Sequence, residues 1–556
     1  MKSLKPIKSV AKLLRIKDCE LEYSGQYKAK INLSILKRLP SKKRSKYILI
    51  SAMTPTALGE GKTLTTIGLS MALNALRLKA AATLRQSSLG PLFGAKGAAG
   101  GAGLCTVLPA DEVNLHLTGD MHAVGVANNL LVSFLENSIF HGNPLKIDAN
   151  SITIKRCLDI NDRSLRHIHY VLKSGHQKFE ISTGFEITAA SEIMSILTLS
   201  RDFDDMRRRL SNIIVAKTYD GNCVSARDLR ADGMMCAILK EAIKPNLVQT
   251  SEGTPCFIHS GPFANISIGA SSIIADRIAL GLCDYVVTES GFGADCGAEK
   301  FFDIKCRYSG LKPDVCVLVC STRALKAQSG KFHVVPGQKI DQAIYNEDIE
   351  ALQQGAVNLK KQISNITLFG VPVIVCLNVF STDTRKELDY IKEKSREFGA
   401  LDCVESTVYQ EGSKGALSLA RSVVKHANRP EPALNFLYED ETSLAHKIET
   451  IAKKVYGAGS VEYSQVARQQ LDFYESKGFG RLPVCIAKTQ FSLSHNEALK
   501  GAPSGFVFPV KDVRLASGAG FILAHASLMQ TMPGLPSEPR GEKVDVDVSG
   551  EVTGLF

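Results

Sequence analysis

The sequence lacks the features of several protein classes. No uncharged apolar run reaches the roughly 18 residues that a membrane-spanning helix needs, which argues against an integral membrane protein. Its fourteen cysteines form no C-x-x-C pair, and Cys316, Cys320 and Cys376 lie within apolar runs. This pattern argues against a disulfide framework or a zinc site and indicates buried thiols in a reducing compartment. Tryptophan is absent altogether. We therefore expect a cytoplasmic protein without a membrane span.

The composition is that of a globular chain, but its charge is unevenly placed. The 556 residues are 44% hydrophobic and 22% charged, which predicts about three to four domains. Residues 1–47 hold fourteen Lys or Arg against three acidic residues and so account for the whole formal net charge of +11. A transit peptide or a nucleic-acid-binding arm would begin in this way. Apolar residues at helical spacing instead favour a helix packed on the body: Leu4, Ile7, Val10, Leu13 and Leu14. We expect no nucleic-acid or membrane partner.

Residues 54–63, TPTALGEGKT, separate an apolar run at 47–53 from a helix-like run at 64–78. A strand, a glycine-bearing loop and a helix in that order direct backbone N–H groups and the positive end of a helix dipole at one point, which binds phosphate. The match to the phosphate-loop pattern G-x-x-x-x-G-K-[ST] is incomplete, because Thr56 replaces the first glycine. An ordinary strand-to-helix turn is the alternative.

We predict that this loop binds a nucleotide with Mg²⁺. Gly59 and Gly61 would let the backbone approach the phosphates, and Lys62 would reach the β and γ oxygens. The Thr63 hydroxyl would ligate the magnesium ion. The predicted nucleotide-binding residues, which the family resemblance given below makes ATP-binding residues, are Thr56, Ala57, Leu58, Gly59, Glu60, Gly61, Lys62 and Thr63.

The segments after the loop contain further candidates. Arg85 follows a short strand-like run at 80–84, so in a parallel, doubly wound sheet it would point into the same crevice as the loop. Five glycines between 94 and 103 suit a loop that wraps a ligand, although a flexible linker is the alternative. Asp120 lies between a turn glycine and a helical run at 123–140, as either a helix cap or a catalytic acid. The neighbouring histidines, His116 and His122, do not have helical metal-ligand spacing.

Strand-like runs resume at 255–258, 285–288, 315–320 and 371–377, with helical stretches between them. This alternation predicts an α/β fold with a phosphate-loop NTPase-like, doubly wound and mainly parallel sheet. Residues 1–140 and 241–434 would form this nucleotide-binding domain. The irregular, charged segment 141–240 predicts an inserted α+β domain, and residues 435–556 predict a C-terminal α+β domain.

Six motifs accompany the loop: LRQ at 84–86, NLHLTGD at 114–120, KPNLVQT at 244–250, EKFFDIKCR at 299–307, CIAKTQ at 485–490 and TMPGLP at 531–536. Together they resemble formate–tetrahydrofolate ligase, also called formyltetrahydrofolate synthetase, over nearly the full length. The resemblance implies ATP-dependent ligation of formate to N10 of tetrahydrofolate, through formyl phosphate, in one-carbon metabolism. The products would be 10-formyltetrahydrofolate, ADP and phosphate. It also implies a homotetramer activated by a monovalent cation, K⁺ or NH₄⁺.

Residue roles follow from this resemblance. Lys62 would bind the transferring phosphate, and Arg85 would bind formate and then formyl phosphate by a bidentate contact. Asp120 would position the pterin or take its proton. The family's aromatic pair around the folate ring falls on Phe380 and Tyr409, where Tyr409 replaces the usual tryptophan; Phe292 is a third folate-binding candidate. Further departures from the family are Gln86, Glu186, Ile268 and Gln328, where Glu, Asp, His and His are usual.

Two alternatives remain from the sequence. A phosphate-loop switch ATPase also begins with a strand, a glycine loop and a lysine, but its loop carries a second lysine near the start, where this chain has Pro55 and Thr56. A non-catalytic relative has no chemical reason to keep Lys62, Arg85 and Asp120. A measurement of whether ADP release requires both formate and tetrahydrofolate would distinguish the ligase from these two alternatives.

Overall fold

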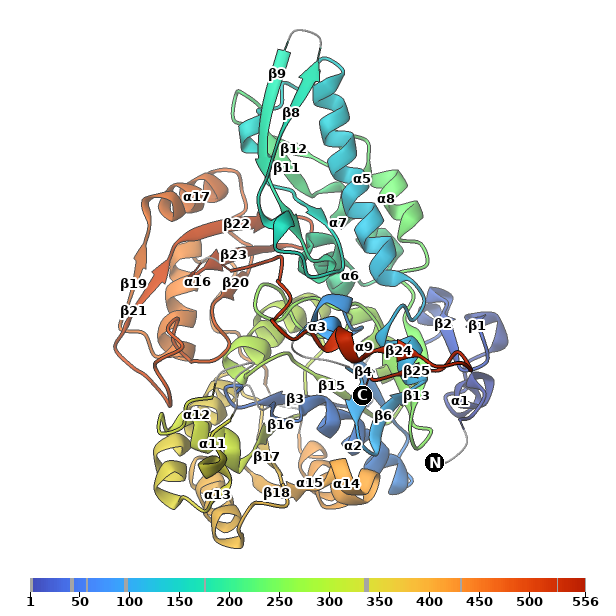
Figure 1. The fold of residues 1–556 in the computed structure, drawn as a ribbon, viewed down its shortest axis with the longest axis vertical. Helices are drawn as coiled ribbons and strands as arrows, with labels where there is room; N and C mark the ends of the chain where they lie inside the picture. Colours follow the sequence, from blue (N-terminus) through green and yellow to red (C-terminus); the bar gives the residue numbers. More distant parts are fainter. Residues whose placement is uncertain are drawn as a thin grey trace.

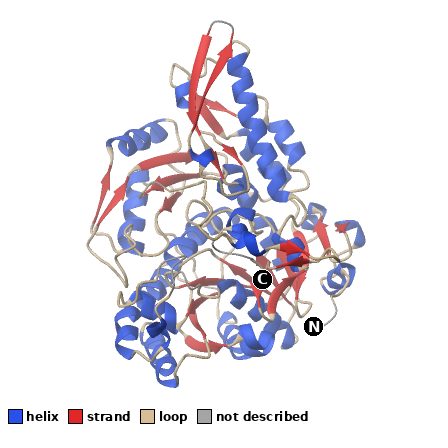
Figure 2. Ribbon diagram, in the orientation of Figure 1, coloured by secondary structure: helices blue, strands red, loops and turns tan. Residues whose placement is uncertain are grey.

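The structure is a computed structural model that describes residues 4–40, 45–56, 59–94, 99–174, 177–334, 340–430, 433–527 and 529–555. A twelve-stranded sheet with helices around it forms the lower half of the molecule in Figure 1, and two smaller groups of elements lie above it. Helices and strands alternate through the lower half (Figure 2).

Ten strands of this sheet follow one path, and two more attach at its edge. In spatial order they are β1 (Leu21–Ser24), β2 (Lys28–Ile31), β13 (Asn246–Thr250), β14 (Pro255–Ile258), β4 (Ala80–Leu84), β15 (Tyr285–Glu289), β3 (Lys46–Ala52), β16 (Val315–Cys320), β17 (Val373–Asn378) and β18 (Asp402–Ser406), with β6 (Cys105–Leu108) and β5 (Gly101–Ala102) beside β13. The strands from β14 to β18 are parallel, whereas β1, β2, β13 and β6 pair antiparallel. The prediction of a mainly parallel α/β sheet is confirmed.

The sheet is buried on both faces. In β3, Tyr47 and Leu49 belong to one apolar core, together with side chains of α9 (Ile273–Leu282) and α12 (Ile349–Thr367). Ile48 and Ile50 belong to a second core, with α2 (Lys62–Ala75) and α15 (Leu417–Ala427). A strand with two buried faces needs a continuous apolar run, which is why the sequence at 47–53 and 315–320 does not alternate.

The basic N-terminal segment folds onto the body. It forms α1 (Ile7–Leu13), which buries Ile7 and Val10, and Leu14 directly after the helix is also buried. The predicted packed helix is confirmed, except that Leu13 is 56% exposed.

Helix α5 (Asp120–Phe140) is the one helix in the described part of the chain that is long and apolar enough to suit a membrane span, with a hydropathy of 1.2. The core helix of a globular protein passes the same test. α5 packs against α6 (Glu192–Leu199), α8 (Asp232–Ile238) and β7 (Arg156–Cys157), and it buries Val124, Leu131 and Leu135. We therefore interpret α5 as a core helix.

The two upper groups come from the segments predicted to be separate domains, together with α5 from the predicted nucleotide-binding domain. The domain boundaries remain a prediction. The hairpin of β8 (Ile168–Ser174) and β9 (Gln177–Thr183) extends to the top of Figure 1, above α7 (Phe203–Ser211), β11 (Ile214–Lys217) and β12 (Cys223–Ser225). The orange group holds α16 (Leu444–Ile451), β19 (Ser460–Tyr463), α17 (Gln465–Ser476), β20 (Val484–Ala487), β21 (Val507–Val510), β22 (Asp512–Ala516) and β23 (Phe521–His525). The last residues leave this group and return to the sheet region, where the Arg540 backbone N–H donates to Gly94 O at 3.1 Å.

Candidate active site

The predicted site residues follow the carboxyl ends of parallel strands, where α/β proteins bind ligands. β3 leads into the phosphate loop, β4 leads into Arg85, and β15 ends at Glu289. Because β4, β15 and β3 are consecutive neighbours, these three endings lie at one edge of the sheet.

Glycine is required at the end of the phosphate loop. Gly61 has φ 85° and directly precedes α2, and a Cβ there would lie 2.7 Å from Asn378 Nδ2. Asn378, the last residue of β17, donates from Nδ2 to the carbonyl of Glu60 at 3.3 Å. The buried Glu60 accepts at Oε1 from the Thr56 backbone N–H at 2.6 Å, and burial raises the pKa of its carboxyl. Gly59 also has positive φ, and Ala57 and Leu58 lie outside the described residues.

Lys62 and Thr63 are the first two residues of α2. The Thr63 hydroxyl donates to Glu289 Oε2 at 2.8 Å, so β15 places a carboxylate directly beside the loop. Burial lowers the pKa of Lys62; the carboxylates of Glu60 and Glu289 oppose this shift, and Arg85 adds to it. Two cations and two carboxyl groups therefore meet at the N-terminus of α2.

Arg85 carries unused hydrogen-bonding capacity. Its Nη1 donates to the carbonyl of Pro262 at 3.0 Å, whereas its Nε is buried without a partner among the described residues. Burial lowers the pKa of this guanidinium, and Glu289 opposes that shift. A buried donor without an acceptor costs free energy, and an oxyanion ligand would remove this cost.

Asp120 is held by residues distant in sequence. It is the first residue of α5, and its Oδ1 pairs with Lys30 Nζ at 2.7 Å, with both side chains buried. Its Oδ2 accepts from Asn246 Nδ2 at 2.8 Å. The helix-cap alternative is wrong, because Gly119 is the N-cap and no side chain caps this end.

The three folate-binding candidates lie on different loops. Phe380 follows β17, and the guanidinium of Arg323 lies over its ring at 3.3 Å from the centroid. Tyr409 is 52% exposed, and its ring approaches Gly103 at the end of the glycine-rich segment. Phe292 has φ 57°, a strained conformation for a residue with a side chain, and strain of this kind is concentrated at functional sites. No aromatic contact joins these three rings in the part of the chain that the structure describes.

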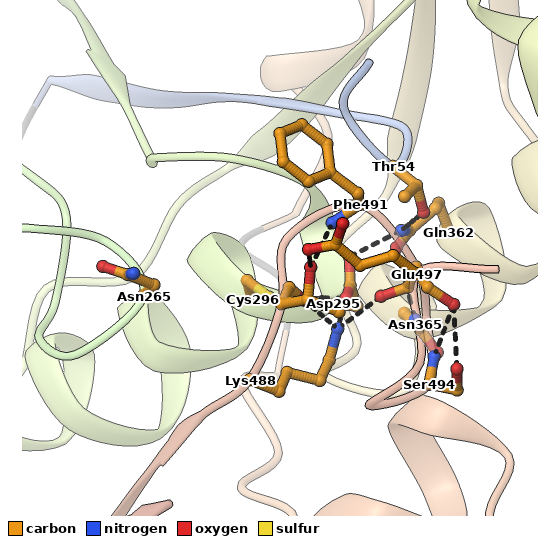
Figure 3. A network of polar contacts seen from close by, with 12 residues as sticks. Thr54, Asn265, Asp295, Cys296, Gln362, Asn365, Lys488, Phe491, Ser494 and Glu497 are labelled. Carbon is orange, nitrogen blue, oxygen red and sulfur yellow. Dashed lines mark hydrogen bonds and ion pairs between the residues drawn. The ribbon is translucent and has the colours of Figure 1, made fainter. Parts of the chain in front are cut away.

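A buried polar network connects the start of the phosphate loop to the C-terminal segment (Figure 3). The Thr54 hydroxyl accepts from Gln362 Nε2 at 3.0 Å, and the same nitrogen donates to Asp295 Oδ1 at 2.7 Å. Asp295 Oδ2 pairs with Lys488 Nζ at 2.7 Å, and both side chains are inaccessible to solvent. Lys488, from the CIAKTQ motif, also donates to the carbonyl of Ser492 at 2.6 Å. The C-terminal segment therefore helps to position the loop.

The structure shows what surrounds three of the residues that depart from the family pattern. Ile268 is buried in the main apolar core. Gln328 accepts at Oε1 from the Gly501 backbone N–H at 3.2 Å. Gln86 is buried, and its backbone N–H donates to Ser260 O at 2.7 Å.

The sequence did not single out Glu289 or Asn378 as site residues. Each is the polar last residue of an apolar strand, and that position was the available signal. As for metals, the described ranges contain no group of three or more His, Cys, Asp or Glu side chains placed to hold an ion.

Fold and site together define an α/β protein with cationic and carboxylate groups gathered at the carboxyl edge of a parallel sheet, beside a helix N-terminus. Comparison with known proteins gives the family. The family model described as formate–tetrahydrofolate ligase matches residues 1–556. Formate–tetrahydrofolate ligase of Roseiflexus castenholzii is 50% identical over 552 residues, covering 99% of this chain and 98% of that protein. The corresponding proteins of Chloroflexus aurantiacus and Desulforamulus reducens are 48% and 47% identical over 560 and 551 residues, covering 100% and 99% of this chain and 98% and 97% of theirs. The chain belongs to the formate–tetrahydrofolate ligase family and is a ligase; the switch-ATPase alternative has no support.

Proposed function

We propose that this chain uses ATP to join formate to N10 of tetrahydrofolate, with formyl phosphate as the intermediate, at the site around Lys62 and Arg85. The observation that carries the proposal is the buried Arg85 Nε without a partner, beside the N-terminus of α2. A guanidinium with free donors suits a carboxylate or an acyl phosphate, whose paired oxygens match its planar fork.

Electrostatics supplies the chemistry of the first step. A formate oxygen attacks the γ-phosphorus of ATP, and the bond from phosphorus to the ADP oxygen breaks. Charge on the phosphoryl oxygens is neutralised by Lys62 and by the backbone N–H groups at the N-terminus of α2. Arg85 holds formate in line and then holds formyl phosphate.

The side-chain oxygen atoms beside the loop suit a magnesium ion as ligands. Mg²⁺ prefers hard oxygen ligands and is usually bound by one or two side chains together with substrate phosphates. Thr63 Oγ1 and Glu289 Oε2, 2.8 Å apart, would be those ligands. When bound, Mg²⁺ neutralises phosphate charge at this position.

The second step needs folate beside the formyl group. The amine N10 attacks the formyl carbon, phosphate leaves, and the amine loses a proton. Phe380, Tyr409 and Phe292 would bind the folate rings, and Asp120 would position the pterin or accept the proton. The contacts of Asp120 with Lys30 and Asn246 fix its carboxylate, which suits positioning.

Further parts of the proposal come from the family resemblance. We propose a phosphate-loop NTPase-like fold for the central domain, a cytoplasmic homotetramer, and activation by K⁺ or NH₄⁺, for which no ligands are assigned.

The test is ADP release by the purified chain with ATP and Mg²⁺, measured with formate, with tetrahydrofolate, with both and with neither. Release only with both substrates supports the proposal, and Lys62→Ala should abolish it while the circular dichroism spectrum is unchanged. Release without either substrate would favour a simple ATPase, and no release with both would favour a non-catalytic relative.

A further inference from the structure

A second cavity lies away from the phosphate loop. It has a volume of about 360 Å³, within the range of small-molecule pockets, and none of its lining residues is among those proposed for ATP, formate or folate. Its walls come from β10 (Phe185–Glu186), α6 and β11 on one side and from α17, β22 and β23 on the other. In Figure 1 these are the teal and the orange groups in the upper half.

The two walls are fixed against each other. Glu192 Oε1, at the start of α6, accepts from the backbone N–H groups of Gly518 and Ala519 at 2.6 and 3.1 Å. Arg209 Nη1 donates to the carbonyl of Ala519 at 2.7 Å, and the Ile214 backbone N–H donates to Ser517 Oγ at 2.9 Å. The cavity is therefore preformed, which lowers the entropic cost of binding.

Three polar side chains on its lining have functional groups without a hydrogen bond in the described part of the chain. The Lys155 ammonium and the Glu186 carboxylate make no hydrogen bond or ion pair there, although each charge stabilises the other and Arg514 acts on both. His525, which is only 4% exposed, has a buried Nε2 without a hydrogen-bond partner there. The neighbouring Asp512 is different, because it accepts from Arg514 Nε and from Gln470 Nε2, both at 2.8 Å.

Removing these two charges from water is costly. Burial raises the pKa of Glu186 to about 7 and lowers the pKa of Lys155. Lys155 and Arg514 oppose the effect of burial on the pKa of Glu186, and Glu186 and Asp512 oppose it on the pKa of Lys155. Lys155 directly precedes β7, which pairs with the β10 strand that carries Glu186, so one positive and one negative group lie side by side. A ligand that brought a carboxylate to Lys155 and an ammonium group to Glu186 would give each group a hydrogen-bonded partner of opposite charge.

The rest of the lining is largely apolar and includes Ile154, Ile193, Ile214, Phe473 and Leu523. We propose that this cavity binds a small amphipathic zwitterion, a molecule with one carboxylate and one ammonium group on an apolar body. Lys155 and the His525 Nε2 receive the carboxylate, Glu186 receives the ammonium group, and the aliphatic and aromatic wall receives the body.

Isothermal titration calorimetry on the full chain tests this with L-phenylalanine and L-leucine as probes. The matched analogues are phenethylamine, which lacks the carboxylate, and 3-phenylpropionate, which lacks the ammonium group. We expect at least one amino acid to bind once per chain, with each analogue weaker by about tenfold or more, the effect of losing one charge-assisted hydrogen bond. Absence of binding by both amino acids, or equal binding by the single-charge analogues, overturns the proposal.

Two variants assign the site. Lys155→Met and Glu186→Gln should each weaken amino-acid binding by about tenfold or more. Lys386→Met and Glu393→Gln, two exposed positions on α13 (Arg385–Glu397), are the matched controls and should bind like the parent. Melting temperatures establish that the variants fold. If Lys155→Met does not fold, Glu186→Gln alone still tests the site. Unchanged binding by a folded variant contradicts the assignment.

Discussion

The Thr63 hydroxyl and the Glu289 carboxylate lie 2.8 Å apart although 226 residues separate them in the chain. The contact exists because β15 is the sheet neighbour of β3, which brings the end of one strand beside the loop that follows the other. Of the described carboxylates, Glu289 is the one that accepts a hydrogen bond from the hydroxyl proposed to bind Mg²⁺.

Glu289→Gln tests the magnesium assignment. The amide keeps the size of the side chain and can still accept from Thr63, but it loses the negative charge. We expect turnover to fall by about tenfold or more and the Mg²⁺ concentration for half-maximal activity to rise. Activity measured against Mg²⁺ concentration checks this, with the exposed Glu393→Gln as control. An unchanged Mg²⁺ requirement would remove Glu289 from the metal site.

Arg85→Lys should not be a conservative change, because a point charge cannot replace a planar fork on a carboxylate. We expect a higher KM for formate together with lower kcat, and little change in the KM for ATP. Steady-state kinetics with each substrate varied in turn is the measurement. Arg385→Lys, at an exposed arginine on α13, should match the parent. Normal formate kinetics in the Arg85 variant would show that this guanidinium does not bind formate.

Tyr409 tests the predicted folate clamp. Stacking supplies about 1 kcal/mol per ring beyond the burial of area, so Tyr409→Ala should raise the folate KM several-fold and leave the KM values for ATP and formate unchanged. Tyr409→Trp should tighten folate binding or leave it as it is. The exposure of Tyr409, at 52%, leaves its ring open to a ligand. A folate KM equal to that of the parent in the alanine variant would contradict the clamp.

The pair formed by Lys488 and Asp295 should be important for stability. Lys488→Met leaves the Asp295 carboxylate buried without its counter-ion, and the loss of one partner of a buried pair costs about 3–5 kcal/mol. We expect a lower melting temperature, with a partial recovery when Asp295→Asn is added. Thermal unfolding of the two single variants and the double variant measures the coupling. Additive losses would mean that the pair is not coupled.

We expect Glu192 to make the stability of the fold depend on pH. Burial raises the pKa of Glu192 to about 7, and the neighbouring Glu186 contributes in the same direction. Between the ordinary carboxyl pKa and about pH 7, the folded state therefore keeps a proton that the unfolded state has released. The free energy of unfolding decreases as pH rises through this window. Glu192→Gln cannot titrate, and its melting temperature relative to the parent should increase from about pH 5 to about pH 8. A constant difference across these pH values would show that Glu192 does not titrate in this window.

Local sequence determined the elements that carry the site. The apolar run at 315–320 coincides with β16, and the run at 80–84 coincides with β4. A strand buried on both faces needs an unbroken run of apolar residues, and a helix needs residues that can end it. Each element can therefore be predicted from the residues of its own segment. Helix α2 begins two residues earlier than expected, because Gly61 takes the left-handed conformation that starts it. The family, too, was evident from motifs that lie within single segments.

Only the tertiary structure decided which side chains meet. Asp120 looked like a helix cap by its position, yet its carboxylate pairs with Lys30 and Asn246, 90 and 126 residues away, as well as with the nearby Thr118. Glu289 and Asn378 became site residues because β15 and β17 end at the same edge of the sheet as β3. The CIAKTQ motif was visible in the sequence, but the burial of Lys488 against Asp295 was not. Hydrophobic spacing specifies strands and helices one at a time, whereas the order of strands in the sheet sets which polar ends face one another, and that order follows from the packing of the whole chain.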